Sequence, residues 1–316
     1  METTRYTVSV VMCTYNGEKY LREQLDSILT QTYPIFEIII QDDRSTDSTF
    51  EICREYESQH SNIRLYENKI NLGFNHNFKS AAMKATGDFV AFSDQDDIWF
   101  PTKIEKQIAA IGEHDICFTT HLRGVKQEES HLVSPQYTFL SNLFQGFAGH
   151  TMLLRKEFIQ QESSWTDYII YDWALIISAH LGRGIIRVEE PLNWHRSHED
   201  SAASELHRKF YPHEKENTNY EPLLHGPSNY FKLQRKENWK KLYQHIYDHT
   251  DKIKFPLEHK TCKLLLDEGK WTSLIRLCFI CLKHYKTIYP DRERANKTRG
   301  VLYPFIFAYH NTNYDL

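Results

Sequence analysis

The sequence predicts an α/β fold with a mostly parallel central sheet, followed by a helical extension at the C-terminal end. Over the first ~120 residues, short β-rich apolar runs alternate with amphipathic helical stretches, a pattern typical of sheets whose faces are both covered by helices. Beyond residue ~205 the pattern becomes helical and rich in Lys, His and Tyr, with few strand signals.

The first 100 residues contain four predicted strands and three predicted helices. Short apolar runs give the strands, at residues 7–13, 36–41, 63–67 and 89–93. The first helix, residues 20–30, has its leucines and isoleucine on one face. Capping residues and apolar spacing give the other two helices: one capped by Ser45 or Asp47 that continues through Tyr56, and one through Phe78 and Ala85 that Gly87 ends.

The rest of the chain divides into a mixed region and a helical region. Residues 101–205 should contain a helix after Pro101, strands at 116–120, 151–154 and 184–188, a Gly-rich turn at 146–149, and a helix at 171–181. The polar, Pro-containing segment 212–227 looks like a linker. We therefore expect one α/β domain over residues 1–205, made of halves 1–100 and 101–205, and a separate helical region over 206–316.

The charges are distributed unevenly along the chain. Residues 1–100 have 16 acidic and 9 basic side chains, residues 101–204 have 13 and 9, and residues 205–316 have 13 and 20. A net charge of -4 argues against a nucleic-acid partner. The acidic front suits a cation site, and the basic C-terminal region suits an anionic surface such as lipid headgroups. A solvated helical face rich in Lys explains the C-terminal charge equally well.

The N-terminus and the cysteines predict a cytoplasmic protein. The apolar run at residues 8–13 is too short for a signal peptide. No segment approaches the roughly 18–20 apolar residues of a membrane span. The pair Cys278 and Cys281 lacks the second pair that a zinc site needs, so core packing is the expected role. Peripheral contact with the inner face of the cytoplasmic membrane, through the basic C-terminal region, is a separate hypothesis.

An acidic run follows the fourth predicted strand directly, at Asp94-Gln95-Asp96-Asp97. Three carboxylates within four residues repel one another unless protons or a cation neutralise them. Mg²⁺ and Mn²⁺ prefer oxygen ligands, commonly one or two carboxylates together with substrate phosphates. The alternative is an N-cap for the helix that begins near Pro101, which accounts for Asp96 or Asp97 but not for all three residues.

Two other predicted strands end in polar runs at the same edge of the sheet. Asp43 follows the second strand and could accept a hydrogen bond from a nucleobase, and Tyr15 beside Asn16 follows the first and could stack on a base. Capping by Ser45 or Asp47 is an equally plausible role for the second run. Several other site types are unlikely because their motifs are missing from the sequence: GxGxxG, GxxxxGK[ST], HExxH and GxSxG.

The ordered motifs of the first ~200 residues resemble the inverting family 2 glycosyltransferases of the GT-A fold, in the form found in bacterial polysaccharide and rhamnosyl-type transferases. The likeness is carried by residues 8–17, 41–47, 71–73 and 87–92, and by the string Ser93-Asp94-Gln95-Asp96-Asp97-Ile98-Trp99. Arg44 stands where this family usually has Gly. The resemblance implies a Rossmann-like GT-A domain with a nucleotide-binding half and an acceptor half.

The resemblance also assigns roles to single residues. It implies that Asp172 is the catalytic base and that Asp96 binds the metal together with His198. Arg196 would belong to the loop that closes over the diphosphate, although Glu199 and Asp200 depart from the family pattern there. The nucleotide sugar would contact Thr14, Tyr15, Asn16, Asp43, Asn71, Asp94 and Gln95. The acceptor side would include Trp99, Trp173 and His150, which replaces the usual Cys.

These roles describe one reaction and its alternatives. Asp172 would take the proton of an acceptor hydroxyl that attacks the anomeric carbon, while Mn²⁺ or Mg²⁺ offsets charge on the departing diphosphate. The implied donor is a UDP-, dTDP- or GDP-linked sugar, and the implied acceptor is a saccharide or lipid-linked saccharide of the cell surface. Alternatives are an N-cap role for Asp172, a surface role for His198, and a degenerate module that binds nucleotide sugar without turnover.

Overall fold

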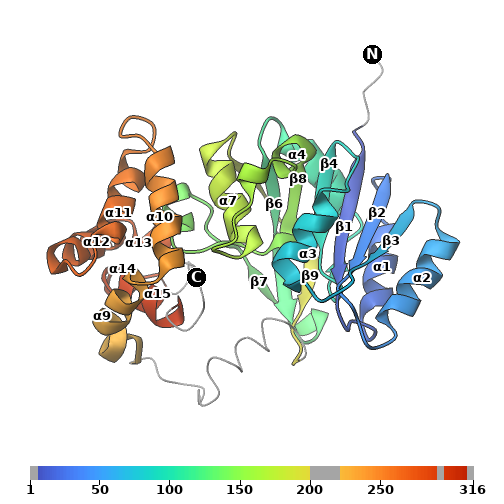
Figure 1. Ribbon diagram of the computed structural model, residues 1–316, viewed down its shortest axis with the longest axis horizontal. Coiled ribbons are helices and arrows are strands. Elements are labelled where there is room, and N and C mark those ends of the chain that lie inside the picture. The colour runs from blue at the N-terminus through green and yellow to red at the C-terminus, as the bar shows by residue number, and fades with distance from the viewer. Residues whose placement is uncertain (1–5, 200–220, 290–294, 312–316) are drawn as a thin grey trace. The chain divides into compact units, whose positions relative to one another are not determined.

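The computed structural model describes residues 6–199, 221–289 and 295–311 (Figure 1). The chain divides into two compact units. The first unit comprises Met1–Ser134, Phe147–Asp167 and Ala174–Ser197, and the second comprises Pro135–Gly146, Tyr168–Trp173 and His198–Leu316. Two short segments from the predicted α/β domain thus belong to the second unit, and the predicted boundary near residue 205 lies outside the described residues.

A nine-stranded sheet forms the centre of the first unit, in the order β3-β2-β1-β4-β8-β6-β9-β5 with β7 paired to β6. Strands β1 to β4 are parallel, and β6 and β9 form another parallel pair. β8 runs antiparallel between β4 and β6. The strands are β1 (Val8–Thr14), β2 (Glu37–Asp42), β3 (Ile63–Glu67), β4 (Phe89–Ser93), β5 (Ile98–Trp99), β6 (Ile116–Gly124), β7 (His131–Val133), β8 (Met152–Arg155) and β9 (Ile185–Arg196).

Helices cover the sheet because successive strand residues point to opposite faces. Val10 and Met12 of β1 pack in one core with Leu25 and Ile104 from the helices, and α3 packs against β1 and β2. The α/β class predicted from the sequence is therefore confirmed. The helices that start in or extend into this unit are α1 (Leu21–Leu29), α2 (Thr49–Gln59), α3 (Gly73–Ala82), α4 (Lys103–Ile111), α6 (Lys156–Ile159) and α7 (Tyr171–Leu181), with short 3₁₀ turns η1 (Gln127–Glu129), η2 (Gly149–Thr151) and η3 (Glu162–Ser164).

Strand β9 is much longer than the segment 184–188 that the sequence predicts. It continues through Pro191 to Arg196, and its register against β6 shifts between Thr119 and Leu122. Proline in a strand is tolerated at such irregularities, because the missing N–H then breaks no regular ladder bond. The extension pairs Asn193 and Trp194 with the short strand β5, beside the acidic run.

Lys103 of α4 is fully buried under the sheet. Its ammonium group lies 4.3 Å from the centroid of the Trp99 ring, and Nζ donates a 2.8 Å hydrogen bond to Gln107. Burial lowers the pKa of Lys103 to about 7, because an apolar surrounding disfavours the charged form. The lysine is therefore charged in only about half of the molecules near pH 7.

The second unit is a helical assembly with an aromatic core. Trp239 is fully buried, contacts the rings of Tyr230, Tyr243 and Phe307, and donates a hydrogen bond from Nε1 to Leu265. The helical C-terminal region predicted from the sequence is confirmed. Its helices are α5 (Phe139–Asn142), α9 (Glu221–Gln234), α10 (Glu237–His249), α11 (Pro256–Leu266), α12 (Trp271–Lys283), α13 (Tyr285–Ile288), α14 (Lys297–Val301) and α15 (Tyr303–Asn311).

The predicted linker at 212–227 is wrong for its last residues, because 221–227 belong to α9, with Pro227 inside the helix. Residues 212–220 lie outside the described part of the chain. A Cβ on Gly226 would lie 2.4 Å from Cβ of Phe305 in α15. Gly226 therefore allows two helices to pack closely, and this tertiary contact overrides the loop-forming tendency of Gly-Pro. No helix within the described ranges has both the length and the hydropathy of a membrane span.

Candidate functional site

The carboxyl ends of β1, β2 and β4 lie at one edge of the sheet, because these strands are parallel and adjacent. Thr14, the last residue of β1, is buried and donates a 2.9 Å hydrogen bond to Asp42 at the end of β2. Asp42 also accepts hydrogen bonds from Ser45. The polar runs singled out in the sequence therefore come together, at the edge where open α/β sheets bind ligands.

The loop after β1 is joined to the acidic run by Gln95. The Tyr15 N–H donates to Oε1 of Gln95, and Nε2 of Gln95 donates to the Tyr15 carbonyl, both at 2.9 Å. Gly17 is needed here, since a Cβ at this position would lie 2.2 Å from Oε1 of Gln95. The ring of Tyr15 stays 48% exposed, so it is free to contact a ligand.

Asn16 joins the same loop to the segment after β2. Its N–H donates to Ser45, and its side-chain oxygen accepts from the Thr46 N–H at 2.8 Å. Arg44 has a φ of 68°, a left-handed conformation that Gly adopts without strain. This backbone geometry explains why the family usually has Gly there, and Arg44 pairs with Glu67 at 2.8 Å.

Asp43 is buried against the N-terminus of α3. Its carboxylate accepts hydrogen bonds of 2.7 and 2.8 Å from the N–H groups of Leu72 and Gly73. Asn68 adds a third, at 2.7 Å, and the side chain of nearby Asn71 accepts from Gly73. A carboxylate at a helix N-terminus satisfies open N–H groups and the helix dipole. Asp43 thus fixes the 71–73 turn, and its predicted contact with a base stays a prediction.

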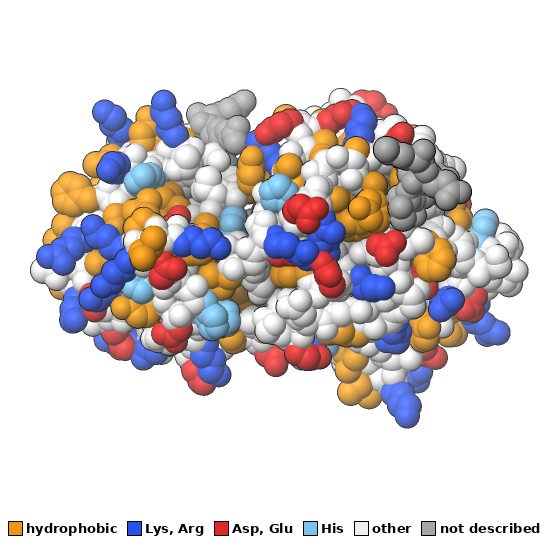
Figure 2. Space-filling model, turned by 90° about the horizontal axis from the view of Figure 1, so that it is seen from above, with side chains coloured by type: hydrophobic (Ala, Val, Ile, Leu, Met, Phe, Trp, Pro, Cys, Tyr) orange, Lys and Arg blue, Asp and Glu red, His pale blue; other side chains and the backbone are white. Residues whose placement is uncertain are grey.

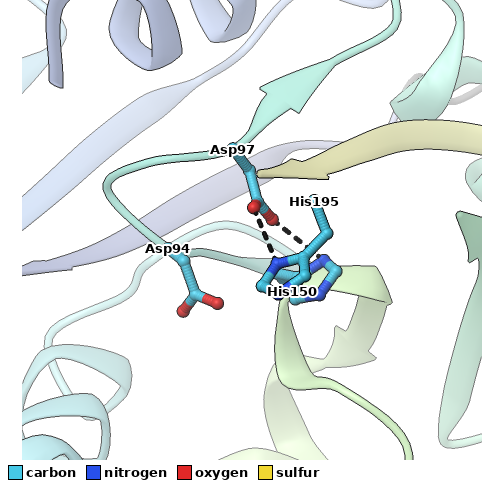
Figure 3. Close-up of side chains that lie close together, drawn as sticks. All are labelled: Asp94, Asp97, His150 and His195. Atoms are coloured by element: carbon cyan, nitrogen blue, oxygen red, sulfur yellow. Dashed lines mark hydrogen bonds and ion pairs between the residues drawn. The ribbon is translucent and has the colours of Figure 1, made fainter. Parts of the chain in front are cut away.

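Asp97 links three separate segments of the first unit. It is fully buried; its Oδ1 lies 2.9 Å from Nδ1 of His195 in β9, and its Oδ2 lies 3.0 Å from Nδ1 of His150 in η2 (Figure 3). Asp94, His150, His195 and Asp97 each offer one ligand atom, and these four atoms lie within 4.8 Å of one another. We call these four residues the Asp97 cluster. Two carboxylates and two imidazoles are a donor set that fits a metal ion.

Burial and hydrogen bonding set the protonation states around Asp97. Burial raises the pKa of Asp97, and the hydrogen bond with His195 opposes this shift. Burial lowers the pKa of His195, but the hydrogen bond and charge of Asp97 outweigh that effect and raise it overall. Burial lowers the pKa of His150 well below its ordinary value and that of His121 to about 3. His150 and His121 are therefore neutral at pH 7.

Arg196, at the end of β9, also contacts the acidic run. Its Nε donates a 3.1 Å hydrogen bond to the backbone carbonyl of Asp96, and its guanidinium pairs with Glu23. The group also lies over the rings of Tyr20 and Trp194, at 4.4 and 4.5 Å from their centroids. The structure thus places the predicted diphosphate residue Arg196 next to the predicted metal ligand Asp96.

Several predicted site residues lie elsewhere. Asp172, Trp173 and His198 belong to the second unit, where Oδ1 of Asp172 accepts a 2.7 Å hydrogen bond from the Trp173 N–H and Trp173 donates to Asn142. Trp99, His150 and Trp173 expose only 2%, 2% and 4% of their surface. The roles of all these residues stay predictions.

One residue of this cluster was missed in the sequence, and the role of another was left open. His195 was not singled out, and Asp97 was given a helix cap as an equally good role; in the structure α4 begins only at Lys103. The available signal was the third carboxylate of the acidic run together with two isolated histidines, His150 and His195. Their meeting depends on the long strand β9, which Pro191 obscured.

Comparison with known proteins identifies the chain's family. The model for "Glycosyl transferase family 2" matches residues 9–170, which include the strand ends, the acidic run and His150. The chain belongs to glycosyl transferase family 2. The resemblance and the GT-A fold predicted from the sequence are thereby confirmed, whereas the rhamnosyl-type subgroup stays a prediction.

Individual relatives agree with this family assignment. The Escherichia coli protein named UDP-Glc:alpha-D-GlcNAc-diphosphoundecaprenol beta-1,3-glucosyltransferase WfgD is 37% identical over 114 residues, covering 36% of this chain and 44% of its own length. Alignments with the first four curated relatives cover 39% to 44% of those proteins. The family 2 chain thus spans about two fifths of the length of these relatives.

Solved structures share the fold over nearly the whole family 2 chain. S. aureus TarS 1–349 in complex with UDP-GlcNAc has a TM-score of 0.57 at 19% identity, covering 97% of this chain and 89% of that one. The mannosyltransferase PcManGT from Pyrobaculum calidifontis, in complex with GDP-Man and Mn²⁺, has a TM-score of 0.55 at 17% identity, covering 99% and 88%. At these identities the likeness concerns the fold alone.

Proposed function

We propose that this chain is a glycosyltransferase that moves a sugar from a nucleotide-diphosphate donor to a hydroxyl group, with inversion at the anomeric carbon. Family membership supports the reaction class. The observation that carries the proposal is the pair of hydrogen bonds between Gln95 and the Tyr15 backbone. These bonds hold the acidic run beside the loop that we propose to bind the base. A nucleotide-diphosphate donor needs this arrangement, because its base lies at one end and its diphosphate at the other.

The residues after β4 fit a hard divalent cation, Mn²⁺ or Mg²⁺. Asp94 and Asp96 are both partly exposed at the ligand-binding edge, and oxygen donors of this kind bind such ions together with substrate phosphates. We propose Asp96 as the direct ligand; the family resemblance adds His198 as a further one. When bound, the ion offsets negative charge on the diphosphate leaving group.

Separate residues of the chain are proposed to bind the donor and to remove the acceptor proton. Tyr15, Asn16 and Asp43 bind the nucleoside. Arg196 presents its cationic guanidinium group to the diphosphate, and its hydrogen bond to the Asp96 carbonyl fixes the position of that group. Asp172 accepts the proton of the attacking hydroxyl, so that displacement and deprotonation occur together. A single displacement of this kind inverts the configuration of the sugar.

A donor screen tests this proposal. We expect one UDP-, dTDP- or GDP-linked sugar at about 100 times its Kd to stabilise the protein by roughly 2.7 kcal/mol in the presence of Mn²⁺, a rise in Tm of about 4 °C for a chain of 316 residues. EDTA should abolish both this shift and sugar transfer, and added Mn²⁺ should restore them. Metal-dependent donor binding with no product across a broad acceptor panel would favour the degenerate binding module instead.

The acceptor is proposed to be a lipid-linked saccharide in cell-surface polysaccharide assembly, since the name of WfgD describes a diphosphoundecaprenol-linked acceptor. A membrane-facing surface would suit such an acceptor. On α12, Trp271, Ile275 and Phe279 follow one another at four-residue spacing and are 57%, 52% and 63% exposed. Residues four apart share one face of a helix, so these side chains form an exposed apolar stripe.

Basic side chains flank this stripe, among them the exposed residues Lys270, Arg276, Lys283 and Lys286. Figure 2 shows the same mixture, with Lys and Arg side chains interspersed among hydrophobic ones over the C-terminal helices. An apolar stripe surrounded by cations is typical of a helix that lies in the headgroup region of an anionic bilayer. We therefore propose peripheral attachment to the inner face of the cytoplasmic membrane through α12.

Liposome flotation tests this attachment. We expect the triple variant Trp271→Ser, Ile275→Ser, Phe279→Ser to lose at least about tenfold in binding to anionic vesicles, because each buried apolar side chain contributes about 1.5–3 kcal/mol. Ile253→Ser is the matched control, since Ile253 is 94% exposed outside the stripe. Equal flotation of the two variants, or no flotation of the wild type at low salt, would contradict the proposal.

A further inference from the structure

Helix α1 has a polar face, which comprises its N-cap Tyr20 and the helical residues Glu23, Gln24 and Ser27. Their spacing of i, i+3, i+4 and i+7 places them on one side of the helix. Gln24 is fully buried, although glutamine is mostly an exposed residue. Burial of an amide costs free energy unless its donor and its acceptor are hydrogen-bonded. The partners of Gln24 therefore indicate what its burial provides.

The amide nitrogen of Gln24 connects α1 to the start of the acidic run. Nε2 donates a 2.7 Å hydrogen bond to Oγ of Ser93, the last residue of β4. Oγ of Ser93 in turn donates a 2.8 Å hydrogen bond to the backbone carbonyl of Asp94. A hydroxyl group has a single proton, so accepting from Gln24 directs that proton toward Asp94. Gln24 thereby fixes the backbone at the first residue of the run.

Ser27 extends this network to the chain just after the acidic run. Its hydroxyl donates to Gln24, at 2.8 Å from the backbone carbonyl and 3.0 Å from Oε1. Oγ of Ser27 accepts a 3.0 Å hydrogen bond from the Trp99 N–H. The buried glutamine and its neighbour Ser27 thus contact the chain on both sides of the run.

The same face of α1 also reaches the middle of the acidic run, through Arg196. Glu23 pairs with the guanidinium group of Arg196, which lies 4.4 Å from the centroid of the Tyr20 ring. Nε of Arg196 donates a 3.1 Å hydrogen bond to the Asp96 carbonyl. The backbone of the run is therefore connected to α1 at its start, in its middle and just beyond its end.

We propose that Gln24 is a positioning residue for sugar transfer, which fixes the backbone of the acidic run through Ser93 and Ser27. The inference rests on the proposed function, because Asp94 and Asp96 are the residues proposed to bind the donor and its metal ion. Neighbouring carboxylates repel one another, so a segment that contains three of them needs outside contacts to keep one conformation. A backbone that is already ordered lowers the entropic cost of binding the donor and the ion.

Hydrogen–deuterium exchange of the full-length protein without any ligand tests whether Gln24 orders the run. Gln24→Met keeps the length of the side chain and removes its amide. We expect the backbone amides of residues 94–99 to exchange about tenfold faster in this variant, because lost hydrogen bonds favour local opening. Ser93→Ala breaks the same connection and should have the same effect, so it keeps the test available if Gln24→Met fails to fold. Unchanged exchange at residues 94–99 overturns the proposal.

Gln234→Met is the matched control. Gln234 is 2% exposed in the second unit, where its Nε2 donates a 3.0 Å hydrogen bond to the Leu265 carbonyl. The same substitution at this buried glutamine should leave exchange of residues 94–99 unchanged. Equal acceleration in both methionine variants would mean that the effect is a general loss of stability, which also overturns the proposal.

Steady-state kinetics separate positioning from a merely structural role. Gln24→Met should raise the KM for the donor and the Mn²⁺ concentration for half-maximal transfer, each by about tenfold, whereas a smaller folded fraction lowers only kcat. The double variant of Gln24→Met and Ser93→Ala should be no worse than the more affected single variant, because both changes break one connection. Unchanged constants, or effects that multiply in the double variant, contradict the proposal.

The two kinds of measurement keep this inference distinct from the proposed function. A wild-type protein that transfers no sugar would contradict the proposed function. Exchange at residues 94–99 would still show whether Gln24 orders the acidic run, since that measurement needs neither donor nor metal ion.

Discussion

Asp172→Asn is expected to lower the rate of glycosyl transfer by about 10²- to 10⁴-fold, because the amide cannot accept the proton of the attacking hydroxyl. The substitution keeps the shape of the side chain and an oxygen that can accept the Trp173 N–H, as Oδ1 of Asp172 does now. Donor affinity should stay within about twofold, since no donor contact is assigned to Asp172. Single-turnover kinetics with saturating donor measure the chemical step directly.

Asp167→Asn is the matched control for this prediction. Asp167 is an exposed carboxylate five residues earlier, and no role is assigned to it. Its variant should transfer sugar at the wild-type rate. If Asp172→Asn keeps wild-type kcat, then Asp172 caps the first turn of α7 without taking part in catalysis, and another base must be sought.

Lys103→Met is expected to raise the free energy of unfolding at pH 7 by about 2–3 kcal/mol. The pKa of Lys103 falls to about 7 on folding, whereas an unfolded lysine titrates near 10.4. Between these two values the unfolded chain binds more protons, so wild-type stability should rise with pH by up to about 1.4 kcal/mol per unit. Below about pH 7 both states are protonated and the full cost of the buried charge is present.

Methionine removes that cost but also the hydrogen bond to Gln107, which is why the expected gain is smaller than the whole pKa shift implies. The difference in stability between variant and wild type should shrink steadily from pH 7 to pH 10. Urea denaturation over this pH range measures it. Lys106→Met, on the same helix but half exposed and paired with Glu190, should show no such pH dependence. If the variant is less stable than wild type at pH 7, then the buried Lys103 is charged and its neighbours stabilise that charge.

Local structure was largely predictable where the sequence pattern and the fold agree. Strands β1 to β4 and helix α7 lie within one or two residues of their predicted bounds, because buried parallel strands are continuous apolar runs. The acidic run was recognisable for a similar reason, since three carboxylates directly after a strand have few structural explanations. The hydrogen bonds of Thr14, Asn16 and Gln95 within these loops were not predicted, since the sequence assigned the three residues to the nucleotide-sugar site, and that assignment stays a prediction.

Long-range pairing decided the features that were missed. Gly226 and Pro227 indicate a loop in isolation, but the close approach of Phe305 makes that glycine a helix contact. Pro191 argues against a strand, yet a register shift lets β9 pass through it. In both cases a tertiary contact stabilises a local structure that the residues alone disfavour.

The sequence by itself determined the family, the α/β architecture and the chemical types gathered at the carboxyl edge of the sheet, because these depend on local pattern and on the order of motifs. Only the tertiary structure decided which residues meet. Asp97, His150 and His195 are far apart in the chain, and their contacts depend on the lengths and register of β5 and β9. Side-chain pairing across a fold is set by packing of distant segments, which no single segment's composition encodes.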